Sequence, residues 1–258
     1  MELTALVLAA IGGADLIRAA APGARLRTAG VSAVLVVCAL AGAALGADPL
    51  ASLVLALGPV VAALGWLATM RADDSPLGFL PVVLLGGIAL TAIVVPPPAV
   101  AIRVEWGQGE GLPLSLVLLA AGGALFLLES ANRVVRTALR TEDVPADGDA
   151  APSRRRRIFG QRGERDTAAP DPQDVHTLRG GRLIGPLERI VVGGLLLAHA
   201  YPVVAALIAA KGIVRFPEIS RDRERGTQAE YFLVGSMVSW AQALAITALV
   251  WLGSAALG

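Results

Sequence analysis

Charged residues are scarce in this sequence of 258 residues: they make up 17% of it, whereas 55% is hydrophobic. A water-soluble domain needs a polar shell, and this chain has too little polar material to form one. The mean hydropathy is +0.66, and apolar runs of about 18 residues or more are typical of transmembrane helices. A net charge of +1 gives the whole chain no attraction for nucleic acid, which we exclude as a partner.

Cysteine is almost absent, and so are the common catalytic motifs. The single cysteine, Cys38, excludes an intrachain disulfide and a cysteine-based zinc site, and its apolar surroundings predict a small buried hydrophobic residue. The sequence has no Walker-type phosphate loop, no HExxH, no GxSxG and no paired membrane carboxylates at catalytic spacing. We therefore expect no cofactor, no metal and no catalytic residue, and an energy-coupled pump is disfavoured.

The apolar runs predict an all-α fold, a polytopic transmembrane helical bundle with six to seven membrane segments. The runs are rich in Ala and Leu and do not alternate with polar residues, which disfavours a β-barrel. Glycines within them, such as Gly12, Gly42, Gly86 and Gly122, are expected to allow close helix packing. The expected segments cover residues 3–21, 29–46, 50–70, 77–95, 112–130 with a helical extension to about 140, a broken stretch at 183–214, and 231–252.

A polar stretch divides the chain into two membrane regions. Residues 141–178 contain four prolines and a run of four arginines beginning at Arg154, and almost nothing there can enter a core. This composition predicts a disordered linker. We therefore expect a five-span N-terminal membrane region at 1–140, the linker at 141–178 and a C-terminal membrane module at 179–258.

Basic residues set the expected orientation. Arginines follow the first, third and fifth segments, so the positive-inside rule places the N-terminus outside and the linker in the cytosol of a bacterial plasma (inner) membrane. A single crossing by residues 183–214 would put Lys211 and Arg215 outside. A re-entrant segment that turns near His199 to Pro202 resolves this conflict. A protein with seven plain spans and a basic outer loop is the alternative.

Several charged residues lie near the ends of the C-terminal segments. Arg182 and Arg189 lie close in sequence to Gly180, Gly181 and Gly185. They could hold an anion at the start of a helix, or they could extend to the membrane interface as ordinary flanking cations. Lys211 and Arg215 are four residues apart and share a helix face, with Glu218 close by in sequence. Together with Glu230, before the last segment, they could bind a phospholipid headgroup or phosphorylated molecule, or could only fix topology.

Other polar residues have simpler interpretations. His199 is the one histidine within a membrane segment; it is a functional candidate by position, although a lone histidine is a poor metal site. Asp15 with Arg18, and Glu129 with Arg133, have helical spacing and are expected to form ion pairs at helix ends.

Three stretches of the C-terminal region, "GGRLIGPLERI", "IAAKGIVRFPEI" and "AEYFLVGSMVSW", occur in this order between Gly180 and Trp240. They resemble the C-terminal membrane module of the bacterial family known as domain of unknown function 3307, over about residues 176–256. The resemblance implies no activity, cofactor or substrate. It does imply that the charged residues of this region form one recurring unit: Glu188, Arg189, Lys211, Arg215, Glu218 and Glu230.

The leading functional hypothesis is binding at the cytoplasmic interface. Arg189, Lys211 and Arg215 would hold an anionic lipid headgroup, a phosphorylated metabolite or another membrane protein, and Glu188 with the other two carboxylates would orient these cations. A small-solute transporter with its site at the break near His199 is the second hypothesis. A membrane-embedded, lipid-modifying enzyme that uses His199 or Glu188 as a base is the third.

Overall fold

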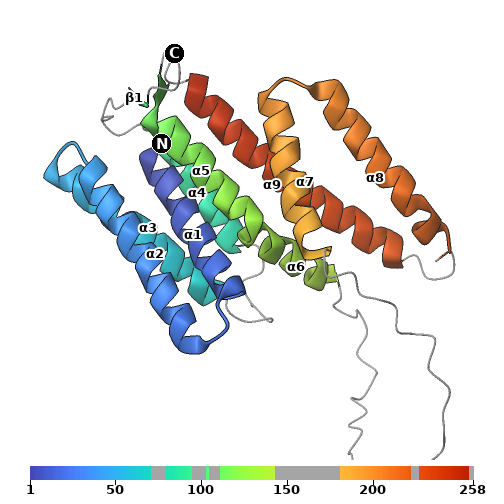
Figure 1. Cartoon of the computed structure of the whole chain (residues 1–258), viewed down its shortest axis with the longest axis horizontal. Helices are drawn as coiled ribbons and strands as arrows, with labels where there is room; N and C mark the ends of the chain where they lie inside the picture. The colour runs from blue at the N-terminus through green and yellow to red at the C-terminus, as the bar shows by residue number, and fades with distance from the viewer. Residues whose placement is uncertain (71–79, 95–102, 105–110, 143–180, 222–226, 256–258) are drawn as a thin grey trace, which may run out of the picture.

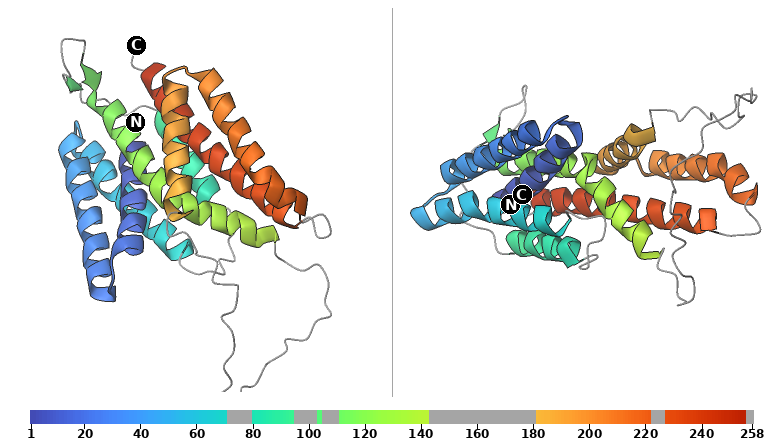
Figure 2. Two further views of the ribbon diagram at one scale, coloured as in Figure 1. Left: turned by 45° about the vertical axis from the view of Figure 1, so that its right-hand side comes forward. Right: turned by 90° about the horizontal axis from the view of Figure 1, so that it is seen from below.

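The computed structural model describes residues 1–70, 80–94, 103–104, 111–142, 181–221 and 227–255, so the linker at 141–178 lies outside the described residues apart from its first two. The described chain is helical except for a short antiparallel ladder of β1 (Arg103–Val104) and β2 (Leu112–Pro113). The helices are α1 (Glu2–Ala20), α2 (Ala24–Leu45), α3 (Pro49–Thr69), α4 (Leu80–Val94), α5 (Leu114–Leu128), α6 (Ser130–Glu142), α7 (Gly181–Leu197), α8 (Tyr201–Arg221) and α9 (Thr227–Ala255). Figures 1 and 2 show α1 to α4 on one side, α7 and α8 on the other, and α5, α6 and α9 between them.

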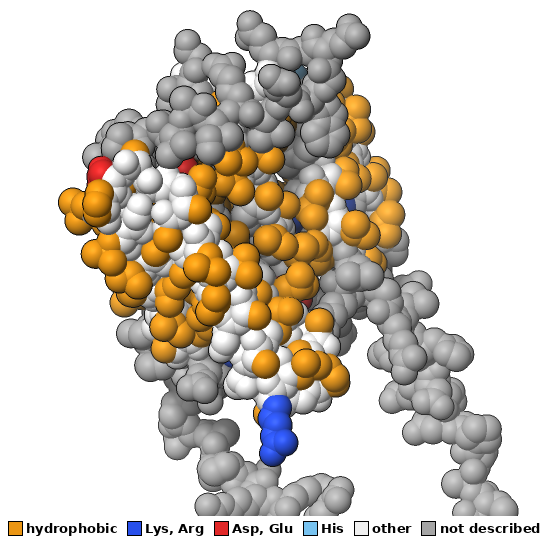
Figure 3. Space-filling model, turned by 60° about the vertical axis from the view of Figure 1, so that its left-hand side comes forward, with side chains coloured by type: hydrophobic (Ala, Val, Ile, Leu, Met, Phe, Trp, Pro, Cys, Tyr) orange, Lys and Arg blue, Asp and Glu red, His pale blue; other side chains and the backbone are white. Residues whose placement is uncertain are grey.

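Several helices are long and apolar enough to cross a membrane. Among the described residues, four qualify by length and composition: α1, α2, α3 and residues Phe232–Ala255 of α9. A fifth is obtained if α5 and the first part of α6, which are bent by 45° relative to each other, count as one span. The apolar parts of α4 and α8 that are described are shorter, so a count of six or seven is not confirmed. Figure 3 shows hydrophobic side chains spread widely over one outer face, a surface that suits lipid rather than water.

The core lies around α1, which packs against α2, α3 and α5. The contact between α1 and α5 requires glycine, because a Cβ on Gly12 would lie 2.5 Å from the backbone carbon of Leu125 and a Cβ on Gly122 would clash with the carbonyl oxygen of Ala5. Small residues of this kind let helix backbones approach closely. The predicted packing role is confirmed for these two glycines, whereas a Cβ on Gly86 would meet nothing within 4 Å.

The predicted break in the sixth segment is a reversal of the chain between α7 and α8. Ala200 N donates to Leu195 O at 2.9 Å and His199 N donates to Leu196 O at 3.0 Å, the hydrogen-bond pattern of a Schellman cap. His199 has a φ of 58°, the left-handed conformation in which that motif usually places glycine. Pro202 follows in the first turn of α8, where its missing N–H costs nothing. Residues 183–214 are therefore a helical hairpin and not one straight helix.

The hairpin turn lies at the same end of the bundle as the N-terminus and the end of α9 (Figure 1). The starts of α7 and α9 and the end of α8 lie toward the opposite end, where α6 also ends. The reversal consequently returns Lys211 to the neighbourhood of Glu188, 23 residues earlier in the chain.

Candidate functional site

Glu188 of α7 contacts side chains of α8 and α9, so it joins three helices. The Glu188 carboxylate accepts hydrogen bonds from Lys211 Nζ at 2.8 Å and 2.7 Å, one to each oxygen, and from Trp240 Nε1 at 2.9 Å. The Lys211 ammonium also lies 5.3 Å from the ring centroid of Trp240 and 6.0 Å from that of Phe232. We call Glu188, Lys211, Phe232 and Trp240 the Glu188 cluster. Charge-assisted hydrogen bonds and cation–π contacts thus hold one cation in a fixed position.

The Glu188 cluster is not sealed inside the protein. The side chain of Glu188 is 13% exposed and that of Lys211 is 26% exposed. An ammonium group has three donors, and the two oxygens of Glu188 take two of them. Lys211 therefore keeps donor capacity and contact with the surroundings, which a ligand needs.

Arg189, the next residue, is directed toward α5, α6 and α9 and is 1% exposed. Its Nε donates to Leu127 O at 3.0 Å, its Nη1 to Ser239 Oγ at 3.2 Å and its Nη2 to Asn132 Oδ1. No ion pair of Arg189 occurs within the described residues. Arg189 was expected to contact a ligand directly, but the structure makes it a buried cation that fastens α7 to α5, α6 and α9.

The reason for this position is a break in the fifth apolar segment. The sequence predicted one continuous helix to about residue 140, but α5 ends at Leu128 and Glu129 has φ −126° and ψ −38°. The last carbonyl groups of a helix lack intrahelical partners. Arg189 donates to the carbonyl of Leu127, and Asn132 Nδ2 donates to that of Leu128 at 3.2 Å. The two side chains therefore donate hydrogen bonds to the last carbonyl groups of α5, which have no partner within the helix.

A second polar network lies on α1, around Asp15, whose side chain is fully buried. Its Oδ2 accepts from Trp66 Nε1 and from Ser130 Oγ, each at 2.9 Å. Its Oδ1 lies 3.1 Å from Arg133 Nε and 3.4 Å from Arg18 Nη1. The expected pair with Arg18 is present within α1, and the other three interactions of Asp15 connect α1 to α3 and α6.

The predicted ion pair of Glu129 with Arg133 is wrong. Arg133 pairs with Asp15, and Glu129 lies 3.6 Å from Arg136 Nη2. Helical spacing does hold between the two residues, since Arg133 N donates to Glu129 O at 3.3 Å, but the side chain of Arg133 is taken by Asp15 of α1. Sequence spacing also gave no signal for the network of Asp15, because Trp66 and Ser130 are 51 and 115 residues away.

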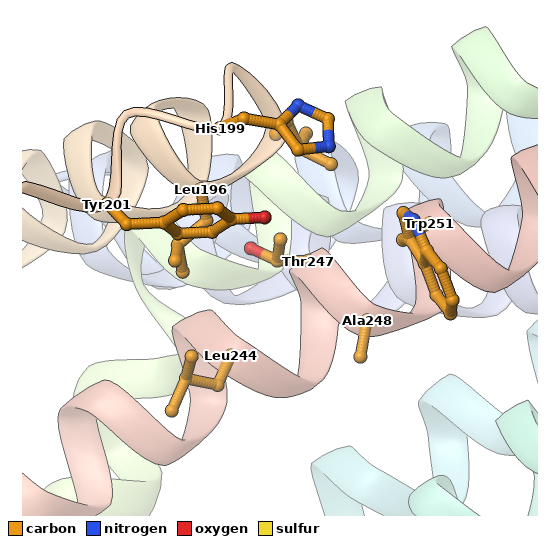
Figure 4. A pocket seen from close by; sticks show the side chains of 8 residues that line it. Leu196, His199, Tyr201, Leu244, Thr247, Ala248 and Trp251 are labelled. Carbon is orange, nitrogen blue, oxygen red and sulfur yellow. The ribbon is translucent and has the colours of Figure 1, made fainter.

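His199 lies in the hairpin turn after α7, whereas Glu188 lies near the middle of that helix. It borders a pocket of about 250 Å³ between the turn and α9, and its ring packs edge-on against that of Tyr201 with centroids 5.9 Å apart. Figure 4 shows the rings of these two residues on one side of the pocket and Trp251 opposite them. The structure thus separates His199 from the other predicted site residues.

The remaining candidates are placed in part. Glu230 is exposed near the start of α9. Arg182 lies in α7, and Arg215 and Glu218 lie in α8, but their side chains are outside the described residues. Of the eight predicted residues, Glu188 and Lys211 are in direct contact, and Arg189 follows Glu188 but bonds to α5, α6 and α9 instead of Lys211.

No protein-family model, curated protein or solved structure matches this chain. Within the part of the chain that the structure describes, no group of three or more His, Cys, Asp or Glu residues could hold a metal ion. The class that the fold defines is an all-helical protein with several apolar helices compatible with a membrane. Any more particular function has to be inferred from the two polar networks and the pocket.

Proposed function

We propose that the C-terminal module binds an anionic headgroup at the cytoplasmic membrane interface through Lys211. The supporting observation is the accessibility of Lys211: its side chain is 26% exposed, and the two oxygens of Glu188 take only two of its three donors. A phosphate would accept the donor that Glu188 leaves free. The proposal assigns this role to the region, about residues 176–256, that resembles domain of unknown function 3307.

Each residue has a distinct part in the proposed site. Glu188, with Trp240, holds the ammonium of Lys211 in place instead of letting it extend freely to water. Arg189 is a positioning residue, because it fixes the start of α7 against α5 and α6. Arg215 follows Lys211 by four residues in α8, the spacing at which two helical residues share a face, and we propose it as the second cation.

The proposed orientation places the N-terminus outside and the linker in the cytosol of a bacterial plasma membrane, with six to seven segments in the bilayer. The hairpin supports it, because it directs Lys211 toward the end of the bundle where α2 starts with the exposed Arg25 and Arg27. All these cations then follow the positive-inside rule.

Headgroup binding can be tested with the full chain in phosphatidylcholine nanodiscs that contain spin-labelled phosphatidylglycerol. We expect the wild type to immobilise this lipid in preference to spin-labelled phosphatidylcholine, and Lys211→Gln to abolish most of the preference. Arg25→Gln is the matched control, since Arg25 is an exposed cation outside the Glu188 cluster. Equal effects of the two substitutions, or no preference in the wild type, would refute the proposal.

A competition arm distinguishes a lipid from a soluble phosphorylated ligand. Glycerol phosphate added to the same nanodiscs displaces the labelled lipid if the site accepts a free phosphate compound. If it does not compete while Lys211→Gln still abolishes the preference, the ligand is a lipid.

Orientation can be tested by thiol labelling in intact cells. In a Cys38→Ser background, single cysteines at position 220 and, as the cytosolic control, position 153 are both expected to be protected from an impermeant reagent. Labelling at position 220 alone would place the end of α8 outside the cell and remove the cytoplasmic site.

The structure does not favour the other two hypotheses. The transporter hypothesis places its site at the break near His199, but the break lies at the end of α7 and of the bundle and not within a span. The enzyme needs a carboxylate beside His199, and the pocket at His199 is lined by none.

A further inference from the structure

The pocket at the hairpin turn is a second site, just beyond the end of α7, whereas Glu188 of the Glu188 cluster lies near the middle of that helix. It is lined by residues from the end of α7, the turn, the start of α8 and the last part of α9: Leu196, Leu197, His199, Tyr201, Leu244, Thr247, Ala248 and Trp251. Its volume of about 250 Å³ is just below the usual range of about 300–1,000 Å³ for small-molecule pockets. That size suits a small ring system and is too small for a whole lipid.

The lining contains polar groups but no Asp, Glu, Lys or Arg. The phenol of Tyr201, the imidazole of His199 and the indole of Trp251 are all potential hydrogen-bond donors. Within the described residues, none of the three side chains has a hydrogen-bond partner in the protein, although each borders the pocket. Figure 4 shows the hydroxyl of Tyr201 directed toward Thr247, across the floor of the pocket. The pocket therefore offers hydrogen-bond donors to a ligand but no side chain of Asp, Glu, Lys or Arg that would favour a charged one.

The backbone at His199 gives an independent reason to assign a function to this pocket. With φ at 58°, this position favours glycine, because a Cβ meets steric repulsion in the left-handed region. A histidine there costs stability that glycine would not. Strained backbone of this kind is found at functional sites, where the side chain is needed. The turn thus keeps an imidazole at the mouth of the pocket at a steric cost.

From these observations we infer that the pocket binds a neutral, planar, membrane-soluble compound that carries a carbonyl group, of the quinone class. A carbonyl oxygen accepts from the donors of Tyr201 and His199, and a flat ring stacks on Trp251. A saturated acyl chain has no acceptor for the hydrogen-bond donors of Tyr201 and His199, and a quaternary ammonium group has none either. The lining side chains of Tyr201 and Leu244 are more than half exposed, which leaves an opening to the bilayer for a prenyl tail.

The test uses the full chain in nanodiscs made from quinone-free phosphatidylcholine and ubiquinone-1, a benzoquinone with one prenyl unit, as the probe. Isothermal titration is expected to show saturable binding to the wild type. Tyr201→Phe keeps the ring and removes only the hydroxyl, so we expect it to weaken binding about two- to tenfold, the effect of one hydrogen bond. Trp251→Leu, which removes the stacking surface, is expected to weaken binding at least as much.

Arg25→Gln is the control, because Arg25 is exposed at the start of α2 and lies in neither site; its binding of ubiquinone-1 should equal that of the wild type. Absence of saturable binding, or equal affinity of Tyr201→Phe and Arg25→Gln, would overturn the inference. Displacement of the quinone by an equal concentration of oleate would also overturn it, since the pocket would then be a site for acyl chains. None of these results depends on whether Lys211 binds a headgroup.

Discussion

Replacing Asp15 with alanine removes an acceptor that side chains of three helices share. The carboxylate of Asp15 is fully buried in α1 and accepts hydrogen bonds from Trp66 of α3 and Ser130 of α6. Arg133 and Arg18 add ion pairs at 3.1 Å and 3.4 Å. We expect Asp15→Ala to destabilise the whole bundle, because α1 lies at the centre of the core.

The loss of stability in Asp15→Ala follows from the hydrogen-bond donors that lose their acceptor, Trp66 and Ser130. Trp66 and Ser130 are both buried, and each donor without an acceptor costs about 1–3 kcal/mol. The side chains of Arg18 and Arg133 are 19% and 21% exposed, so they can turn toward the surroundings, and their ion pairs add little. The expected loss in the free energy of unfolding is about 4 kcal/mol. Asp15→Asn keeps one carbonyl oxygen and should lose about half as much.

The measurement is reversible unfolding of the purified full chain in detergent micelles, followed by circular dichroism. Asp48→Ala is the control, since Asp48 is an exposed carboxylate that caps α3 by accepting from Ala51 N at 2.8 Å, and a lost cap costs about 1 kcal/mol. If Asp15→Ala costs no more than Asp48→Ala, then the network around Asp15 does not stabilise the protein and the reasoning fails.

Three further outcomes are expected. Gly122→Ala should weaken the packing of α1 on α5 by about 1–3 kcal/mol, as overpacking does. Gly86→Ala, in open space within α4, should instead raise stability by about 0.5–1 kcal/mol in the same unfolding measurement, because alanine favours a helix more than glycine does. Arg189→Met removes a buried charge but leaves three acceptors without donors; we expect a net loss of about 2 kcal/mol and faster proteolysis near the start of α7, and unchanged stability would contradict its positioning role. His199→Gly should raise the unfolding temperature by relieving about 1 kcal/mol of strain at φ 58°, whereas His199→Ala should not.

Hydropathy predicted the helices well. The expected ranges agree with α1, α3 and α9 to within a few residues, because long apolar runs with polar ends fix where a helix can begin and end. The reversal near His199 was also predicted, since Pro202 and the basic residues after it conflict with a single crossing. These features are local: each depends on residues that are neighbours in the chain.

The polar contacts were predicted less well. Helical spacing gave the pair of Asp15 with Arg18, but Trp66 and Ser130 come from other helices, and no spacing rule connects them. The bend after Leu128 was not predicted, because no proline near it in the sequence indicates a helix break. The sequence predicted that Arg189 is an accessible cation, whereas the structure buries it. The sequence does not show which side of α7 faces the bend between α5 and α6.

The sequence by itself determined that this chain is helical, rich in apolar segments and divided by a polar linker, because these properties depend on composition and on local periodicity. Only the tertiary structure decided which charged residues meet. It buried Arg189 against the open end of α5, paired Lys211 with Glu188 across the hairpin and placed His199 at a separate pocket. The physical reason is that these contacts join helices whose relative rotation and bend are set by packing, and packing depends on the whole fold at once.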